Sequence, residues 1–303
     1  MRVAVTGATG FLGRYIVRGL SGAGHECRCW QRPDSDRGGF EGLARPVQWV
    51  AGDLADAASM DELVRGADAV VHAALYRPGM GFRGAEGDLP TFVERNLLGT
   101  IRLIEAARAA GVKRLVFIST CAVHEVIVEG HRLDETHPLW PTSHYGAHKA
   151  AIEKFVHSYG LGQGYDICAL RPTGIYGLAR PIEKSKWYDL VQAVACGEPV
   201  ASARGGKEVH ASDVAKAVGI LLAADGIAGQ AYNCYDMYIA DQDVALIAKQ
   251  ITGGESSIEM LNKGPRNQID TAKLRRLGMT FGGKALLEQT IREMVGAQVH
   301  QRE

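Results

Sequence analysis

The first thirteen residues constrain the fold more strongly than any other part of this chain. They read MRVAVTGATGFLG, in which the apolar run Val3–Val5 leads into a turn that contains Gly7, Gly10 and Gly13. The run predicts a buried strand, and the residues after the turn predict the start of an amphipathic helix. At this spacing the first glycine permits a sharp turn, the second permits close approach of a phosphate, and the third permits close packing of helix on strand.

The same turn carries the groups that bind a phosphate. A helix N-terminus presents free N–H groups and a partial positive charge, and a glycine at position 10 leaves them uncovered. A plain tight turn is the alternative, but the apolar strand before it and the amphipathic helix after it favour a nucleotide cofactor. We therefore predict that a cofactor lies against the residues of this turn: Gly7, Thr9, Gly10, Phe11, Leu12 and Gly13.

Short apolar runs alternate with helical patterns up to about Arg171. Continuous runs such as Leu115–Ile118 are typical of strands that are buried on both faces. Alternation of strands and helices implies a parallel sheet with helices on both faces. After Arg171 the pattern weakens, although helical patterns recur near 212–224 and 240–252. The sequence therefore predicts an α/β fold of the doubly wound type.

The composition excludes several classes of protein. Among the 303 residues, 34 Lys+Arg balance 34 Asp+Glu, which argues against nucleic acid or an anionic membrane as the main partner. No apolar run approaches the roughly 20 residues that a membrane span requires, and no signal peptide is visible. The six cysteines are scattered without a C-x-x-C pair, so we expect reduced thiols, no metal site and a cytoplasmic location.

A phenol and an ammonium lie four residues apart in the segment Tyr145–Lys149. On a helix these two side chains share a face. A phenol with an ordinary pKa of about 10 is a poor acid or base at neutral pH, whereas a nearby lysine charge favours the phenolate. Ser119 and Thr120 support the pair, because they follow a predicted parallel strand at its carboxyl end, where ligands bind in such sheets. The pattern indicates proton transfer at an alcohol oxygen.

Together these features resemble the extended short-chain dehydrogenase/reductases, the NAD-dependent epimerase/dehydratase family. The resemblance runs over nearly the whole chain and rests on the following motifs: Gly7–Gly13, Gly52–Leu54, His72–Ala74, Asn96–Thr100, Ser119–Thr120 with Tyr145 and Lys149, Leu170–Gly177, and His210–Ala215. It implies a Rossmann-type doubly wound parallel sheet with a smaller C-terminal substrate-binding lobe. The cofactor-binding domain would span 1–172, with 208–235 returning to it, and 173–207 and 236–303 would form the lobe.

The resemblance also assigns roles to single residues. Tyr145 would be the general acid/base, Lys149 would lower its pKa and hold the nicotinamide ribose, and Thr120 would position the substrate oxygen. Beyond these and the glycine turn, the implied NAD(P) contacts are Asp53, Leu54, Ala73, Ala74, Asn96, Ser119 and Pro172. The implied substrate contacts are Thr120, His124, Thr173 and Tyr176. Tyr76, in the glycine-rich loop 76–90, is a further candidate substrate contact, with a solvated loop as the alternative. Family members form dimers through two helices, which implies a homodimer built on 92–110 and 145–160.

Two departures from the family pattern bear on cofactor and reaction. Gln31 stands where NAD-preferring members often carry an aspartate, and the following Arg32 suits a 2′-phosphate, so we predict a preference for NADP over NAD. A solvated Arg32 is the alternative. Cys121 and Ala122 stand where the family's dehydratases usually carry Asp-Glu, so the acid for water elimination is absent. His124 stands where many members have a tyrosine, which predicts a reshaped substrate pocket.

Further departures concern the substrate. Thr173-Gly174 and Gly205–Glu208 stand where nucleotide-sugar epimerases often carry an asparagine and an arginine, which weakens the case for a nucleotide diphosphate. The segment 173–207 is basic. Its cations either bind a carboxylate or phosphate of the substrate or form a solvated surface, and they are Arg180, Lys184, Lys186, Arg204 and Lys207.

We predict an NAD(P)-dependent oxidoreductase that transfers a hydride between a nicotinamide cofactor and a secondary alcohol or ketone of a small, sugar-like substrate. A redox-neutral sugar epimerase is the alternative, because these motifs do not decide whether the hydride returns to the same molecule. A cofactor-sensing binding protein is the second alternative. The complete set of Thr120, Tyr145 and Lys149 argues against it.

Overall fold

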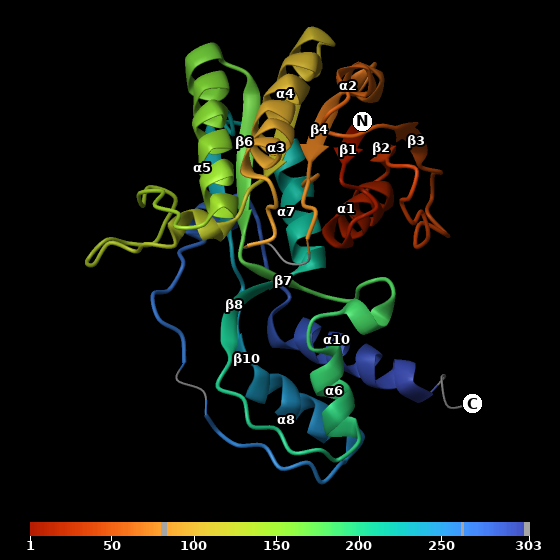
Figure 1. Ribbon diagram of the computed structural model, residues 1–303, viewed down its shortest axis with the longest axis vertical. Coiled ribbons are helices and arrows are strands. Elements are labelled where there is room, and N and C mark those ends of the chain that lie inside the picture. Colours follow the sequence, from red (N-terminus) through yellow and green to blue (C-terminus); the bar gives the residue numbers. More distant parts are fainter. Residues whose placement is uncertain (80–83, 262–263, 300–303) are drawn as a thin grey trace. The chain divides into compact units, whose positions relative to one another are not determined.

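The computed structural model describes residues 1–79, 84–261 and 264–299, and the chain divides into two compact units (Figure 1). The first unit comprises Met1–Pro172, Val214–Cys234 and Ile269–Met279. The second comprises Thr173–Asp213, Tyr235–Gln268 and Thr280–Glu303. The bounds differ from the predicted ones mainly at 208–213, which belong to the second unit, and at 269–279, which belong to the first.

The first unit contains a seven-stranded sheet in the order β3-β2-β1-β4-β5-β6-β9, in which every neighbouring pair is parallel. Its strands are β1 (Arg2–Thr6), β2 (Glu26–Gln31), β3 (Gln48–Ala51), β4 (Ala69–His72), β5 (Arg114–Ile118), β6 (Asp166–Pro172) and β9 (Gln230–Cys234). The chain builds outward from β1 in one direction and then resumes at β4 in the other. The predicted doubly wound parallel sheet is confirmed, and its topological switch point lies between β1 and β4.

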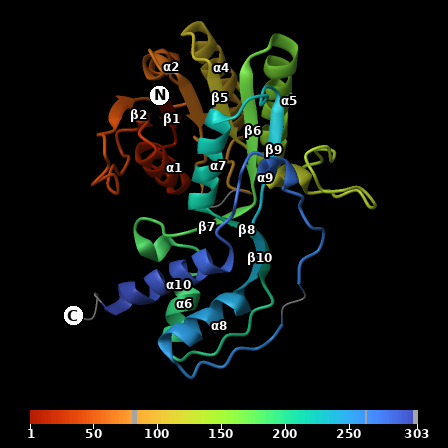
Figure 2. The ribbon, with the colours of Figure 1, turned by 180° about the vertical axis from the view of Figure 1, so that it is seen from behind.

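Helices cover both faces of this sheet, with α2, α4 and α5 on one side and α1 and α7 on the other (Figures 1 and 2). The helices are α1 (Phe11–Gly22), α2 (Ala57–Val64), α3 (Leu89–Val93), α4 (Gly99–Ala109), α5 (His144–His157), α7 (Ala211–Ala223, whose first three residues belong to the second unit) and α9 (Ala272–Arg276). The helix predicted over 92–110 is α3 and α4 joined by a π-helical turn, Glu94–Leu98. A second π-helical turn, Ser158–Gly162, follows α5.

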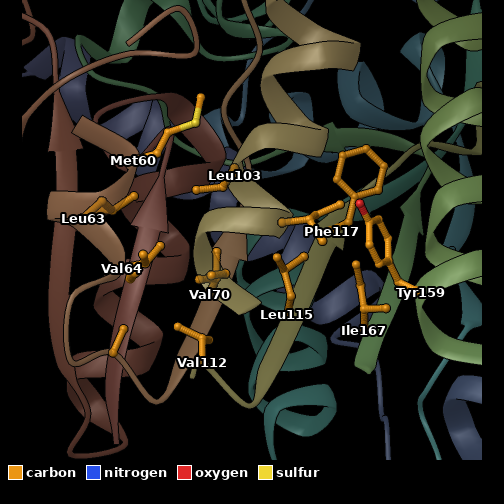
Figure 3. Packing of buried hydrophobic residues seen from close by; sticks show 14 of the residues in the cluster. Met60, Leu63, Val64, Val70, Leu103, Val112, Leu115, Phe117, Tyr159 and Ile167 are labelled. Carbon is orange, nitrogen blue, oxygen red and sulfur yellow. The ribbon is translucent and has the colours of Figure 1, made fainter. Parts of the chain in front are cut away.

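Apolar side chains from the α2, α4 and α5 side fill the core of the first unit (Figure 3). Leu63 and Leu103 extend from helices toward the sheet, where they meet residues such as Val70, Leu115 and Phe117. All five are 0–1% exposed. Because β4 and β5 carry apolar residues at consecutive positions, they bury both of their faces, as central parallel strands do.

The second unit contains a smaller mixed sheet in the order β10-β8-β7, in which β7 is parallel and β10 antiparallel to β8. Its elements are β7 (Gly174–Tyr176), β8 (Gly205–His210), β10 (Met237–Ala240), α6 (Tyr188–Ala195), α8 (Asp241–Thr252), α10 (Gly283–Val299) and a 3₁₀ turn (Ile182–Lys184). Apolar residues of α6, α8 and α10 pack against one another and against Tyr176 and Ile239 of the sheet. The sequence did not predict these three strands, nor β9.

Strand β9 forms one edge of the seven-stranded sheet. Its Asn233 N–H donates a hydrogen bond of 2.8 Å to the Glu135 carboxylate, from the segment between β5 and α5. Leu133 of the same segment forms an isolated parallel bridge with Ile269. A side chain therefore takes one backbone donor of an edge strand.

Candidate active site

The glycine turn after β1 has two glycines that the fold itself requires. Gly7 has a φ of +70°, and a Cβ there would lie 2.7 Å from the carbonyl carbon of Ala73. A Cβ at Gly13 would lie 2.0 Å from the Gly7 carbonyl oxygen. Gly10 differs, because it is exposed and a Cβ there would meet only the Gly7 oxygen, at 3.2 Å. The fold therefore leaves open the space above Gly10, which fits the close approach of a pyrophosphate.

The N-terminus of α1 adds a second feature that suits an anion. Gly10 is its N-cap, so no side chain caps the helix, and its first turn contains no acidic residue. The N–H groups of Phe11, Leu12 and Gly13 consequently have no acceptor within the helix. Thr9 lies beside them and its carbonyl accepts a hydrogen bond from the Arg14 guanidinium. These residues fit the phosphate-binding role predicted for the turn.

A buried hydrogen-bond network joins the turn to the end of β4. The Thr6 hydroxyl oxygen accepts hydrogen bonds of 3.1 Å from both the Ala73 and the Ala74 N–H. It must therefore donate its own proton to the His72 Nδ1, at 2.7 Å. Burial, and next the Lys149 charge, lower the pKa of His72 to about 3, so the ring is neutral. Ala73 and Ala74, predicted cofactor contacts, thus use their N–H groups within the chain.

The network continues to the loop after β4. His72 carries its proton on Nε2, which donates to the Thr100 hydroxyl at 2.8 Å, and Thr100 donates to the Asn96 carbonyl. The Asn96 carboxamide accepts from the Tyr76 N–H at 2.8 Å and donates to the Tyr76 and Phe92 carbonyls at 2.9 and 3.0 Å. Asn96 therefore holds Tyr76, a predicted substrate contact, in place.

The predicted adenosine contacts lie beyond β2 and β3. Asp53 accepts a hydrogen bond of 2.7 Å from the Ala55 N–H, and Leu54 is buried. The Arg32 side chain is 59% exposed and lies 3.5 Å from the Asp34 carboxylate. Its backbone N–H donates to the Ser35 hydroxyl at 3.0 Å. Arg32 is thus a solvated cation with an exposed acidic neighbour.

Thr120 follows β5 and caps a short 3₁₀ turn, Cys121–His124, by accepting a hydrogen bond of 3.1 Å from the Ala122 N–H. The turn is fixed to the start of α5 by Glu125, whose carboxylate accepts hydrogen bonds from the Ser143 N–H and hydroxyl at 2.8 and 3.0 Å. Thr120 is 9% exposed. Its hydroxyl therefore lies at a constrained position at the carboxyl end of the sheet.

Tyr145 and Lys149 both lie on α5, which Ser143 caps through a 3.1 Å hydrogen bond to the Gly146 N–H. Gly146 was missed by the sequence analysis, although it is part of the segment that contains the pair. A Cβ there would lie 2.7 Å from the Ala122 carbonyl oxygen. Only glycine therefore lets the first turn of α5, with Tyr145, pack directly against the turn that follows Thr120.

Lys149 is buried, whereas Tyr145, four residues before it on α5, is half-buried. The Lys149 Nζ donates to the Ile118 carbonyl at 2.7 Å and lies 4.5 Å from the Phe117 ring centroid. Burial lowers the pKa of Lys149 to about 7, and the Glu153 carboxylate opposes this shift. The ammonium therefore has a position fixed at the end of β5, and its charge can be removed near neutral pH.

A buried ion pair that the sequence analysis missed joins Glu153 of α5 to Arg171 of β6. The Arg171 guanidinium donates from Nε to both Glu153 oxygens at 3.0 Å and from Nη2 to Oε2. The Ser119 hydroxyl donates to the same carboxylate. Arg171 also donates to His124 Nε2 at 3.2 Å, so His124 carries its proton on Nδ1, facing the Pro138 carbonyl. Ser119 and His124 are thus both held by this pair.

A profile of the NAD dependent epimerase/dehydratase family matches residues 3–234. The chain belongs to this family. It is 30% identical over 301 residues to a dTDP-glucose 4,6-dehydratase of Streptomyces niveus, a match that covers 91% of this chain and 86% of the relative. Several other curated relatives are matched over about half of their own length. The resemblance stated from the motifs is confirmed.

Two solved structures share the fold over almost the whole chain. One is DesIV, a dTDP-glucose 4,6-dehydratase of Streptomyces venezuelae with NAD bound, at 26% identity and a TM-score of 0.78, covering 100% of this chain and 98% of that one. The other is a UDP-glucose 4-epimerase of Thermus thermophilus in complex with NAD, at 26% identity and a TM-score of 0.75, covering 98% of both chains. Both are enzymes of the epimerase/dehydratase type.

The residues that follow Thr120 have no acidic side chain before Glu125. The Cys121 thiol donates to the Arg171 carbonyl at 3.0 Å. Burial raises the pKa of Cys121 to about 12. Burial, and next the Arg171 charge, lower the pKa of His124 to about 4. Cys121 and His124 are therefore both neutral at physiological pH, and Ala122 has no proton to give.

The last predicted contacts follow β6. Pro172 is the final residue of this strand and pairs with Cys234 of β9. Thr173 and Tyr176 belong to the second unit, and neither the Thr173 Oγ1 nor the Tyr176 hydroxyl has a hydrogen-bond partner among the described residues. Tyr176 is fully buried, and its ring centroid lies 5.0 Å from that of His210.

Two further results concern membrane-spanning helices and groups of metal ligands. In the described part of the chain, no helix combines the length and apolar character that crossing a membrane requires. Residues 1–79, 84–261 and 264–299 also contain no group of three or more His, Cys, Asp or Glu residues that could hold a metal ion.

Proposed function

We propose that the protein transfers a hydride between a nicotinamide cofactor and a secondary alcohol or ketone of a sugar-like substrate. The observation that carries this proposal is the placement of Tyr145 and Lys149 on one helix, with Lys149 buried at the end of β5 beside the turn that Thr120 caps. A buried ammonium beside a phenol favours the phenolate and so prepares Tyr145 for proton transfer at neutral pH.

The residues present fit a dinucleotide. The open space above Gly10 and the uncapped N-terminus of α1 would hold the pyrophosphate. Asp53 would contact the adenine end, and Lys149 the nicotinamide ribose. The cofactor, when bound, supplies or accepts the hydride. We further propose that NADP is preferred over NAD, because Gln31 brings no negative charge to the end of β2 and Arg32 follows it.

The chain's own residues would transfer the proton. In the direction of oxidation, Tyr145 takes the hydroxyl proton of the substrate; in reduction it returns that proton to the carbonyl oxygen. Thr120 would hold the same oxygen through its hydroxyl. The buried Lys149 stabilises the negative charge on the phenolate, since a cation close to an ionisable group favours the charged form.

Water elimination is disfavoured in this chain, although its relatives include dTDP-glucose 4,6-dehydratases. By resemblance, the acid of those enzymes would stand at positions 121 and 122. Here the Cys121 thiol, with a pKa raised by burial to about 12, and Ala122 occupy them. Redox-neutral epimerisation is the alternative, and the likeness to the Thermus thermophilus UDP-glucose 4-epimerase favours it.

The decisive experiment supplies NAD or NADP with a panel of free sugars, uronates and nucleotide sugars, and records absorbance at the reduced-nicotinamide band. Net formation or loss of reduced cofactor supports the proposal. A changed sugar without net change in absorbance indicates the epimerase. If no panel member reacts in either direction while the cofactor binds, the protein is a cofactor-sensing binding protein instead.

We also propose that the second unit binds the substrate and that the protein is a homodimer. Support for the dimer comes from apolar side chains that α5 and the π-helical turn before α4 leave exposed, Phe155 at 38% and Leu98 at 43%. Light scattering after size-exclusion chromatography measures the assembly. A monomer at micromolar concentration would contradict it.

A further inference from the structure

The second unit buries a carboxylate that is only half paired. Glu208 on β8 is 3% exposed. Its Oε1 forms an ion pair with the Lys186 ammonium, whereas its Oε2 has no hydrogen-bond partner among the described residues. Burial raises the pKa of Glu208, and the Lys186 charge opposes this shift. Buried polar atoms are almost always hydrogen-bonded, so an unpartnered carboxylate oxygen requires an explanation.

Two glycines make the room for this carboxylate. A Cβ at Gly174 would lie 2.5 Å from Oε2, and a Cβ at Gly206 would lie 2.5 Å from Oε1. Neither glycine has a positive φ, so the backbone does not require glycine at either position. Gly174 is exposed, and its lack of a side chain leaves room for Oε2 beside it. The two glycines therefore leave the space that the carboxylate occupies.

A second unpartnered group lies on the same face of the sheet. Gly174 pairs with Glu208, and Tyr176 pairs with His210 two residues along, so the side chains of Glu208 and Tyr176 point to one side. The Tyr176 hydroxyl is buried without a partner, and Glu208 is one of the carboxylates that raise its pKa, after burial. The Tyr176 hydroxyl is thus an unpaired donor and Glu208 Oε2 an unpaired acceptor. An alcohol group can accept from the first and donate to the second.

Lys186, the cation beside Glu208, already has partners within the chain. Lys186 pairs with Oε1, and its Nζ lies 4.8 Å from the Trp187 ring centroid. Trp187 has a φ of +69°, a left-handed conformation that is strained for a bulky residue, and donates to Asp241 at 3.1 Å. A further lysine of this region, Lys207, donates to the Arg266 carbonyl at 2.7 Å. Both lysines therefore already have a partner within the chain.

We propose that Glu208 determines substrate specificity: its free oxygen and the Tyr176 hydroxyl bind an alcohol group of an uncharged polyhydroxylated substrate, and its negative charge disfavours nucleotide diphosphates. This inference rests on the proposed function, for which it names the substrate class. The substrate hydroxyl donates to Glu208 Oε2 and accepts from Tyr176. A diphosphate at the same place would put negative charge beside a buried carboxylate, which Coulomb repulsion opposes.

The test compares the wild type with Glu208→Gln, which keeps the shape of the side chain and removes its charge. With saturating NAD or NADP, calorimetry measures the binding of D-glucose, D-galactose, UDP and UDP-glucose. We expect the wild type to bind a free sugar and neither UDP compound. The variant should bind that sugar about tenfold more weakly, as loss of a hydrogen bond to a charged group implies, and should bind UDP measurably. Glu255→Gln, an exposed position in the same unit, is the matched control.

A second variant keeps Glu208 intact. Gly174→Ala places a methyl group within 2.5 Å of the position of Oε2 and displaces the carboxylate without changing its charge. Sugar binding should weaken as in Glu208→Gln, while UDP should still be excluded. With a substrate in hand, both variants should raise KM and leave kcat within about twofold. Unchanged sugar affinity in both folded variants would mean that only water occupies the site, and the inference would fail.

The result separates this inference from the proposed function. A wild type that binds UDP-glucose more tightly than every free sugar, or that binds no sugar at all, overturns the role of Glu208. A wild type that binds a sugar through Glu208 yet transfers no hydride overturns the proposed function, but the role of Glu208 in sugar binding still stands. Hydride transfer on a nucleotide sugar with a KM that Glu208→Gln does not alter overturns the site alone.

Discussion

Each unit of the molecule contains an ion pair whose carboxylate is buried, and the two pairs are built differently. In the first unit, both oxygens of Glu153 accept hydrogen bonds from Arg171, and Ser119 adds another. In the second unit, Glu208 has an ion pair through Oε1 only, and the Lys186 side chain is 39% exposed. The first pair is saturated by the chain, whereas the second leaves an acceptor unused.

The difference distinguishes a scaffold from a site. A buried pair whose hydrogen bonds are complete holds its neighbours and has nothing left for a ligand, and Glu153 accordingly fixes Ser119, Arg171 and the end of β6. A buried pair with an unused oxygen carries a cost in the folded state that a ligand can remove. This contrast supports the proposal that the first unit carries the chemistry and the second binds the substrate.

The largest effect should come from the phenol of the first unit. In Tyr145→Phe the ring remains but the transferable proton is lost, so turnover should fall by roughly 10²–10⁴, the scale of general acid/base catalysis. Affinity for the cofactor should not change. The matched control is Tyr165→Phe, which removes a buried hydroxyl that has no partner in the described structure, and it should retain near-normal turnover. A Tyr145→Phe enzyme of normal turnover would contradict the assignment of the chemistry.

Substitution of the two carboxylates should lower the unfolding free energy by different amounts. Glu153→Gln leaves the Arg171 charge buried at 1% exposure, which should cost about 3–5 kcal/mol of unfolding free energy. Glu208→Gln leaves a lysine that is able to reach water, and should cost about 1 kcal/mol or less. Urea unfolding of both variants measures the contrast. Equal losses of unfolding free energy would show that the two ion pairs contribute equally to stability.

Lys149 is a buried lysine that donates to a backbone carbonyl, that of Ile118, and the pH dependence of stability should reveal its burial. Its pKa is about 7 in the folded protein, against an ordinary value of 10.5. Between these values the unfolded chain binds one more proton, so the unfolding free energy should rise with pH relative to Lys149→Met. The expected slope of the difference between pH 7 and pH 9 is about 1.4 kcal/mol per pH unit. Denaturant titrations at several pH values measure it, and a flat difference would mean that Lys149 keeps its charge.

The smallest effect should come from an exposed cation, Arg32, whose acidic neighbour Asp34 is exposed as well. Arg32→Ala should weaken NADP binding about ten- to a hundredfold, since a charge-assisted hydrogen bond to the 2′-phosphate is lost. NAD affinity should remain the same. Fluorescence titration with both cofactors measures the change. Equal weakening of both, or tighter binding of NAD by the wild type, would show that Arg32 pairs only with Asp34 and solvent.

The parts of the fold that the sequence predicted are those with long, regular patterns. The apolar run Val3–Val5 predicted a buried strand and the residues after the glycine turn predicted a helix, and the structure has β1 and α1 at these places. The strands of the second unit were missed because β7 has three residues and β8 mixes glycine with charged residues. Their pairing is decided by contacts distant in sequence, which local pattern cannot show.

The candidate site was predictable where residues of one segment cooperate. Tyr145 and Lys149 are four residues apart, and the helix alone brings them to one face. Glu153 continues that spacing and could have been found by it, but a carboxylate on a helix is usually solvated. Arg171 and Glu208 gave no such signal, because their partners lie on other elements. The sequence identified side chains with chemistry and missed those that hold them.

The hydrogen bond from Asn233 to Glu135 has a consequence for how copies of this chain meet one another. An open edge of a parallel sheet offers backbone donors and acceptors to any extended peptide, and strand addition of that kind leads to aggregation. On β9 a carboxylate already occupies one of these donors and brings a negative charge to the strand. The segment that joins β5 to α5 thus also protects the sheet from being extended by another chain.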